Sequence, residues 1–157
     1  MRGPDPVGAM TEAWRRRGLY LAGAWNLVGG ITALADPARH FAQLYGTALS
    51  LADPLQAFFY RATWINVLAW GIGYIVAARH RTGRTPILLA GGLGKLAYAV
   101  ACVGLVVNGI GGAALLASGV LDLLFAAFFA AVLWLPRQGP SDPGGPAGFL
   151  ELRAGDG

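Results

Sequence analysis

Residues 86–107, Pro-Ile-Leu-Leu-Ala-Gly-Gly-Leu-Gly-Lys-Leu-Ala-Tyr-Ala-Val-Ala-Cys-Val-Gly-Leu-Val-Val, form an apolar stretch with a single charge, Lys95, near its middle. A helix of this length can cross about 30 Å of hydrocarbon. Lys95 is the only lysine in the chain. A charge at bilayer depth costs about 3 kcal/mol on insertion scales, so such a residue is normally paired, hydrated or functional. The stretch therefore predicts a membrane helix that carries a polar site.

The rest of the chain has the composition of a membrane protein. Of its 157 residues, 55% are hydrophobic and only 13% are charged, whereas soluble domains carry about 25% charged residues. Three further apolar segments, at about 18–35, 55–78 and 113–135, are also long enough to span a bilayer. We therefore expect an all-α membrane protein, a four-helix transmembrane bundle over residues 18–135.

The arginines indicate how the bundle is oriented. They lie beside the apolar segments, at positions 15–17, between 79 and 84, and at 137, while the loop 108–112 has no charge. Because basic residues favour the cytoplasmic side, we expect both termini in the cytoplasm and residues 1–17 as a cytoplasmic segment. We expect the membrane to be the inner membrane of a bacterium. This placement also explains the net charge of +4 without a nucleic-acid partner.

The first apolar segment has a second interpretation. Three arginines, an apolar core and Ala33-Leu-Ala35 before Asp36 are typical of a cleavable signal peptide. We favour an uncleaved span, because the segment is long for a signal core and Asn26 interrupts it. The sequence also leaves Met10 as an alternative start.

The connection between the first two spans is expected to contain a short helix. Asp36-Pro37 and Asp53-Pro54 are both typical helix starts, since Asp caps free N–H groups and Pro suits the first helical position. Apolar residues follow at helical spacing, namely Phe41, Leu44, Tyr45, Ala48 and Leu49. We predict an amphipathic helix on the external membrane interface. A lid packed on the bundle is the alternative. The Pro- and Gly-rich residues 136–157 are expected to be a disordered cytoplasmic tail.

Four polar residues are expected at one depth in the membrane. Counted inward from the ends of their segments at 1.5 Å per residue, Asn26, Asn66, Lys95 and Asp122 all fall near the middle of the bilayer. Small residues flank each of them at helical spacing and favour close packing of these faces inside the bundle. For Asn66 the small residues are Ala62, Ala69, Gly73 and Ala77.

Two roles for this polar layer stay open. Lys95 and Asp122 would form a buried ion pair that holds the helices together, with the amides satisfying the remaining hydrogen bonds. Alternatively, the residues would line a small cavity for a proton, an ion or a small molecule. Tyr98 lies on the same face as Lys95, and Arg61 would extend the cavity outward. The more common alternative for an arginine at this position is that its side chain extends to the membrane interface.

Other reactive residues give weaker signals. His40 and His80 are expected in loops on opposite sides, where each is solvated and neither can share a metal with the other. Cys102 is expected to be a small core residue. The sequence shows no metal-ligand spacing and no Ser/His/Asp arrangement. We therefore expect no metal and no cofactor, and we do not expect an enzyme.

Part of the chain resembles a known group of proteins. Trp70-Gly-Ile-Gly-Tyr74, a basic turn, the segment from Pro86 to Lys95 and the isolated Asp122 are similar to small, uncharacterised bacterial four-span membrane proteins, loosely DoxX-like. The resemblance covers about residues 56–135. It implies a four-helix fold with a lysine–aspartate theme and no particular activity. Aromatic residues follow the aspartate in that group, whereas here Asp122 is followed by two leucines before Phe125.

These observations leave three functional classes. The first is an accessory or scaffold subunit whose buried Lys95–Asp122 core holds the bundle together. The second is a proton- or ion-coupled transporter or binding protein that uses the same pair. The third is a quinone- or lipid-linked membrane enzyme. The lipid bilayer is the expected partner in each case, and association with a second copy or another membrane protein is expected from the small-residue faces.

Overall fold

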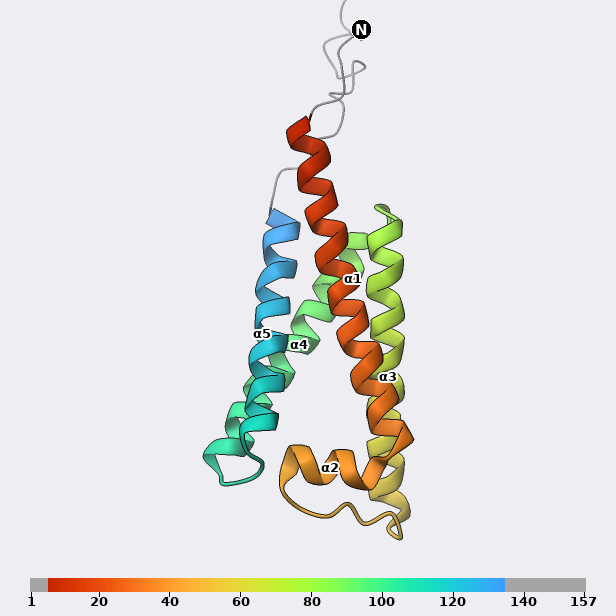
Figure 1. Cartoon of the computed structure of the whole chain (residues 1–157), viewed down its shortest axis with the longest axis vertical. Coiled ribbons are helices and arrows are strands. Elements are labelled where there is room, and N and C mark those ends of the chain that lie inside the picture. Colours follow the sequence, from red (N-terminus) through yellow and green to blue (C-terminus); the bar gives the residue numbers. More distant parts are fainter. Residues whose placement is uncertain (1–5, 135–157) are drawn as a thin grey trace, which may run out of the picture.

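The computed structural model describes residues 6–134, and over this range the protein consists of five helices without a strand. The helices are α1 (Pro6–Ala35), α2 (Pro37–Tyr45), α3 (Pro54–Arg79), α4 (Arg84–Val107) and α5 (Ala113–Trp134). Four long helices run along the molecule and the short α2 lies across one end (Figure 1). The all-helical fold agrees with the expectation. The predicted tail 136–157 lies outside the described residues.

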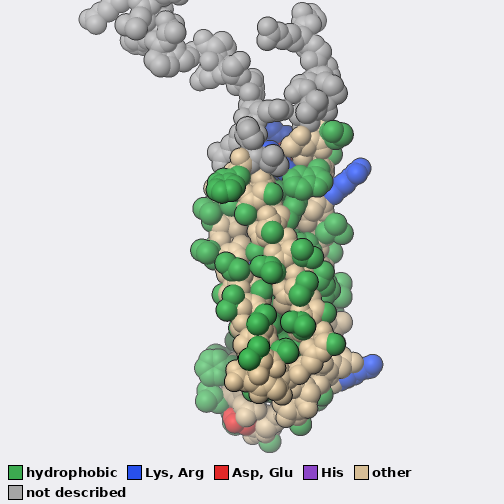
Figure 2. All heavy atoms as spheres, turned by 90° about the vertical axis from the view of Figure 1, so that its left-hand side faces the viewer, with side chains coloured by type: hydrophobic (Ala, Val, Ile, Leu, Met, Phe, Trp, Pro, Cys, Tyr) green, Lys and Arg blue, Asp and Glu red, His purple; other side chains and the backbone are tan. Residues whose placement is uncertain are grey.

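Three helices are long and apolar enough to cross a membrane. They are α1 from Met10, α4 and α5. Helix α3 has 26 residues, which is long enough, but it is less apolar because it carries Gln56, Arg61 and Asn66 together with several aromatic side chains. Apolar side chains cover much of the face shown in Figure 2, and the basic side chains visible there lie near its two ends. This surface resembles that of a membrane protein.

The first helix begins earlier than the sequence suggested. Helix α1 starts at Pro6 and continues without interruption to Ala35, so it extends well beyond the apolar segment 18–35. Residues 6–17 are helical because alanine, methionine, glutamate and arginine favour helix even where they do not favour lipid. That residues 1–17 lie in the cytoplasm stays a prediction. The polar first turns also gain a partner, since Glu12 forms ion pairs with arginines of the α3–α4 region.

The helix starts at the two Asp-Pro pairs are confirmed. Asp36 accepts a hydrogen bond from the backbone N–H of Arg39 at 3.1 Å, and Asp53 accepts one from Leu55 N–H at 2.9 Å. Helix α2 ends earlier than expected, so the prediction was wrong for Ala48 and Leu49, which lie beyond it. Gly46 ends the helix in the left-handed conformation, with φ of 69°, and its N–H bonds the carbonyl of Ala42.

The position of α2 corresponds to a lid on the bundle. It contacts both α1 and α5, and Leu44 is buried. The carbonyl of Tyr45 accepts a hydrogen bond of 3.0 Å from the N–H of Gly111 in the loop between α4 and α5. The structure therefore shows α2 packed on the bundle, as a lid would be, and its position at the external membrane interface stays a prediction.

The long helices form two close pairs, α1 with α3 and α4 with α5. Glycines permit this closeness: a Cβ atom at Gly71 would lie 3.1 Å from the carbonyl oxygen of Gly23, and one at Gly119 would lie 2.8 Å from the Cβ of Cys102. The two pairs meet in one apolar core at the end away from α2, formed by Leu19, Ala22, Tyr74, Ala77, Ala78, Leu88, Phe129 and Val132.

Candidate functional site

Lys95 joins three helices through its ammonium group. Its Nζ donates a hydrogen bond of 2.6 Å to Oδ1 of Asp122 on α5 and one of 2.9 Å to Oδ1 of Asn26 on α1. The amide nitrogen of Asn26 in turn donates to the carbonyl of Val67 on α3 at 3.3 Å. All four long helices are therefore linked at one level. The lysine is only 4% exposed, so the charge is held away from solvent by this cluster.

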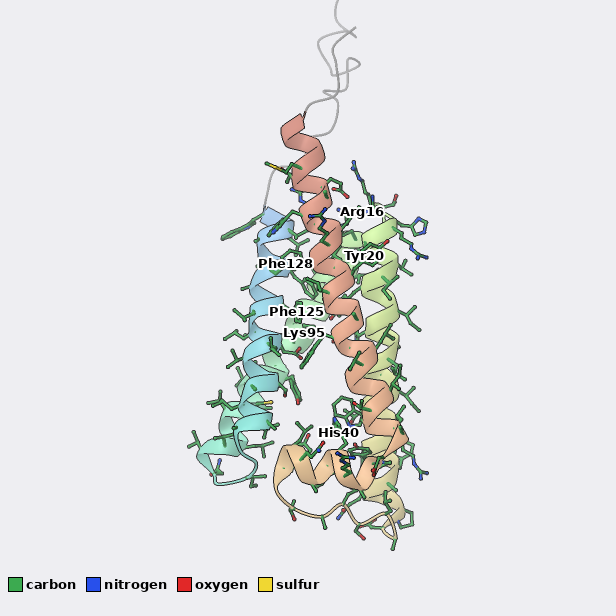
Figure 3. All side chains as sticks on the ribbon, viewed as in Figure 1. Arg16, Tyr20, His40, Lys95, Phe125 and Phe128 are labelled. Carbon is green, nitrogen blue, oxygen red and sulfur yellow. The ribbon has the colours of Figure 1, made fainter. Side chains whose placement is uncertain are left out.

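Aromatic rings complete the surroundings of the Lys95 ammonium. Its Nζ lies 5.7 Å from the ring centroid of Tyr74 and 5.2 Å from that of Phe125, within the range of cation–π attraction. Figure 3 shows Lys95 and Phe125 close together in the middle of the molecule. Tyr74 also packs tightly on Gly91, where any added side chain would collide with the tyrosine ring. The sequence did not indicate that Tyr74 and Phe125 contact Lys95.

A cavity of about 480 Å³ adjoins this cluster. All five helices contribute to its wall, with Lys95 and Asp122 among the lining residues on α4 and α5, and His40 among those on α2. Its volume is in the range of small-molecule sites, which are about 300–1,000 Å³. The cavity exists because the two helix pairs are separated here, between the apolar core and the lid.

The wall of the cavity is mainly aromatic, with a few polar groups. Six large rings line it, from all helices except α5: Trp25, Tyr45, Trp64, Trp70, Tyr74 and Tyr98. Tyr98 shares a hydrogen bond of 3.0 Å with Oγ of Ser118, which itself donates to the carbonyl of Leu115 at 3.1 Å. Aromatic walls with a small number of placed polar groups are typical of sites for small organic molecules.

His40 occupies the lid end of the cavity, and this position was not expected. We predicted a solvated loop residue, but His40 is half-buried on α2 and its Nδ1 lies 3.0 Å from Oη of Tyr60. The hydroxyl of Tyr60 donates a hydrogen bond of 3.3 Å to the carbonyl of Ala33. The rings of Trp64 and His40 pack edge to face, with their centroids 4.6 Å apart. Burial lowers the pKa of His40. The helix start at Asp36-Pro37 was the only sequence signal that placed His40 on a packed helix.

The other predicted site residues have different positions. Asn66 lines the cavity, but it is exposed, and no hydrogen bond joins it to Lys95 within residues 6–134. The predicted inward face of α3 is confirmed at Ala77, which is fully buried in the apolar core, whereas Ala62 and Ala69 of the same face are exposed. Arg61 is exposed and does not line the cavity. Besides small residues, α3 buries the aromatic side chains of Tyr60 and Tyr74, which the small-residue pattern did not include.

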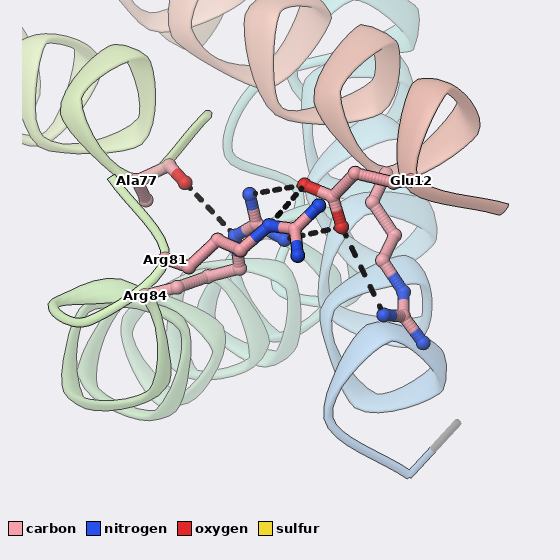
Figure 4. A network of polar contacts seen from close by, with 5 residues as sticks. Glu12, Ala77, Arg81 and Arg84 are labelled. Atoms are coloured by element: carbon pink, nitrogen blue, oxygen red, sulfur yellow. Dashed lines mark hydrogen bonds and ion pairs between the residues drawn. The ribbon is translucent and has the colours of Figure 1, made fainter. Parts of the chain in front are cut away.

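A second charged cluster lies at the opposite end of the bundle from α2. Glu12 accepts two hydrogen bonds from the guanidinium of Arg84, at 2.9 and 3.2 Å, and pairs with Arg81 at 3.4 Å (Figure 4). Nε of Arg84 donates to the carbonyl of Ala77 at 2.9 Å, so this arginine is both buried and satisfied. Through these ion pairs the start of α1 contacts the turn between α3 and α4. Glu12 was not among the predicted site residues, because it lies in the segment 1–17 outside the apolar spans.

The remaining reactive residues do not form a second site. Cys102 is buried against Gly119, as expected for a small core residue. His80 is exposed at the end of α3. Within residues 6–134, no three His, Cys, Asp or Glu residues come close enough to hold a metal ion.

Comparison with known proteins adds no relative. No family model, no curated protein sequence and no solved structure matches this chain.

Proposed function

We propose that this chain is a four-span protein of the bacterial inner membrane that binds a small molecule in the cavity beside Lys95. The fourth span is α3, which packs along α1 and exposes apolar side chains such as Leu55, Ile65 and Ile72. A helix that accompanies a membrane span along its length lies at the same depth. The arginines at the start of α1 and between α3 and α4 gather at one end of the bundle, which favours that end as the cytoplasmic one.

The observation that carries the binding function is the cavity itself. A bundle held together only by its Lys95–Asp122 pair has no reason to keep about 480 Å³ of space next to that pair, because close packing is the more stable arrangement. The cavity places an aromatic wall and a polar cluster within reach of one ligand. That combination favours the binding class over the accessory-subunit class.

The accessory-subunit function is retained as a second candidate because of the hydrogen bonds of Lys95. They link α1, α4 and α5, as a purely structural pair would. Under this function the cavity would be dispensable. The two functions therefore differ in what happens when the cavity is filled but the ion pair is left intact.

Gly94 offers a way to fill the cavity. It lines the cavity, and a Cβ atom added there would meet nothing within 4 Å. Gly104 on the same helix is also exposed with open space around it, but it does not line the cavity. Gly94→Phe and Gly104→Phe are therefore a matched pair of variants with the same change in intrinsic helix propensity.

The test is to extract wild-type protein and both variants from native membranes into polymer-bounded discs and to identify retained small molecules by mass spectrometry. The binding function predicts a compound that accompanies the wild type and Gly104→Phe and is lost from Gly94→Phe. If all three folded proteins retain the same compounds, or none, the binding function is wrong and the accessory-subunit function is favoured.

A further inference from the structure

The chemistry of the cavity wall restricts what the cavity can hold. Among residues 6–134, no lysine, arginine, aspartate or glutamate other than Lys95 and Asp122 lines it. These two residues neutralise each other at 2.6 Å. An ion that entered the cavity would therefore lose its hydration without gaining a counter-charge of its own, and this costs several kcal/mol in a site of low polarity. The remaining titratable side chains on the wall, those of His40 and the tyrosines, offer hydrogen bonds but no permanent charge.

Unused hydrogen-bonding groups remain at the inner end of the cavity. An ammonium group has three N–H donors, and Lys95 directs two of them to Asp122 and Asn26. Only Oδ1 of Asp122 accepts from a described residue, so Oδ2 can accept another bond. The amide of Asn66, on the wall of the same cavity, can donate and accept. A ligand that satisfies these groups must itself carry both an acceptor and a donor.

The cavity reaches the surface at the sides of the bundle. Several of its lining residues are also exposed, including Trp25 and Val28 on α1, Asn66 on α3, Gly94 on α4 and Ala117 on α5. Helix α2 covers one end, with Leu44 buried, and the apolar core around Phe129 fills the other. In a four-span bundle the exposed sides at this level face lipid, so the openings connect the cavity with the bilayer.

We propose, on the basis of the binding function above, that the ligand is an uncharged, membrane-dissolved molecule with a flat ring and a polar end that both donates and accepts hydrogen bonds. Primary amides, phenols and protonated carboxylic acids belong to this class. The polar end lies against Lys95 and Asp122, the ring lies between the aromatic side chains, and the molecule enters between the helix pairs from the lipid.

A series of naphthalene probes tests the chemical class. Wild-type protein in lipid nanodiscs is equilibrated with tritiated 2-naphthamide, naphthalene, 2-naphthalenesulfonate or 2-naphthyltrimethylammonium, and empty nanodiscs correct for partition into lipid. We expect 2-naphthamide to bind about tenfold or more tightly than the other three, since two hydrogen bonds distinguish it from naphthalene. Gly94→Phe should abolish this binding and Gly104→Phe should leave it unchanged.

The route is tested with 2-naphthamide carrying a chain on the ring carbon far from the amide. An acyl chain keeps the probe in the bilayer, whereas a long poly(ethylene glycol) chain keeps it in water. We expect only the acylated probe to bind in a manner that Gly94→Phe abolishes.

Each other outcome overturns the inference. Preferred binding of the sulfonate or the ammonium probe, sensitive to Gly94→Phe, would show a cavity for ions, so the binding function would stand while the ligand class would be wrong. Equal binding of naphthalene and 2-naphthamide would remove the role of the polar end. Binding of the poly(ethylene glycol) probe would show an aqueous route. If no probe binds, the inference is wrong, and the binding function is decided separately by the compounds extracted from native membranes.

Discussion

Removing Asp122 alone or Lys95 alone should destabilise the bundle more than replacing both residues together. Removing one member of a buried ion pair leaves an uncompensated charge, whereas replacing both members with uncharged side chains of similar size is often nearly neutral. The pair is largely withdrawn from solvent, with side-chain exposures of 5% for Lys95 and 14% for Asp122. The loss in the free energy of unfolding from the double substitution should therefore be smaller than the sum of the losses from the two single substitutions.

We predict that Lys95→Met lowers the free energy of unfolding by about 3–5 kcal/mol, because Asp122 keeps its charge without a partner. The double variant Lys95→Met/Asp122→Asn should recover most of this loss. The measurement is reversible unfolding in mixed detergent micelles, followed by circular dichroism. Additive losses in the double variant would show that the two side chains do not interact.

The sequence identified Lys95, Asp122 and Asn26 because polar residues are conspicuous in apolar segments and depth can be counted along a helix. It raised a cavity as one of two alternatives but could not decide between them, since a cavity depends on how far the helix pairs separate. His40 was missed for a related reason. Its partners Tyr60 and Trp64 belong to another helix, and their contact depends on α2 folding back over the bundle.

At the scale of single elements, α2 should respond to pH through His40. Burial lowers the pKa of this imidazole in the folded protein, while the unfolded chain has the ordinary value of about 6.5. The unfolded state therefore binds the proton more readily. The stability that the neutral imidazole contributes is fully present above about pH 6.5 and is lost as the pH falls toward the lower pKa of the folded state.

We predict that the melting temperature of the wild type falls between pH 7.5 and pH 5.5, and that it falls less in His40→Gln. Differential scanning fluorimetry in nanodiscs measures both. His80→Gln is the control, because His80 is exposed at the other end of the bundle. An equal fall in wild type and His40→Gln would exclude His40 as the source.

The first turns of α1 should contribute to the stability of the bundle, as its apolar part does. Arg84 is 8% exposed and has Glu12 as its carboxylate partner within residues 6–134. We predict that Glu12→Gln lowers the free energy of unfolding by about 3 kcal/mol, since it leaves a buried guanidinium without a counter-charge. Arg17→Gln, which changes the charge of an exposed residue on the same helix, should change it by less than about 0.5 kcal/mol. Equal effects of the two variants in the same unfolding assay would contradict the role given to Glu12.

Helix boundaries were predicted with unequal success along the chain. The Asp-Pro caps located the starts of α2 and α3 because capping is a local interaction that a few residues determine. The start of α1 at Pro6 was not predicted, because the end of an apolar segment need not be the end of a helix. The small-residue face predicted on α3 is buried at Ala77 but exposed at Ala62 and Ala69, so the pattern of small residues located the inner face only in part.

At the scale of the whole molecule, the number of spans can be measured directly. Starting from Cys102→Ala, single cysteines replace Thr47, Arg81 or Asn108, all of which are exposed between helices. Four spans predict that a membrane-impermeant maleimide added to spheroplasts labels positions 47 and 108 but labels position 81 only after lysis. If α3 did not cross the membrane, positions 47 and 81 would be labelled together.

Because Lys95 is the only lysine, it also provides a direct measurement of ligand binding. Protein labelled with ¹³C at the lysine Cε carbon gives one signal in a nanodisc, and that signal reports on the cavity beside Asp122. We predict that 2-naphthamide shifts this signal in the wild type and in Gly104→Phe and leaves it unchanged in Gly94→Phe. A signal that no probe of the naphthalene series moves, or one that moves equally in all three proteins, would contradict a binding site at Lys95.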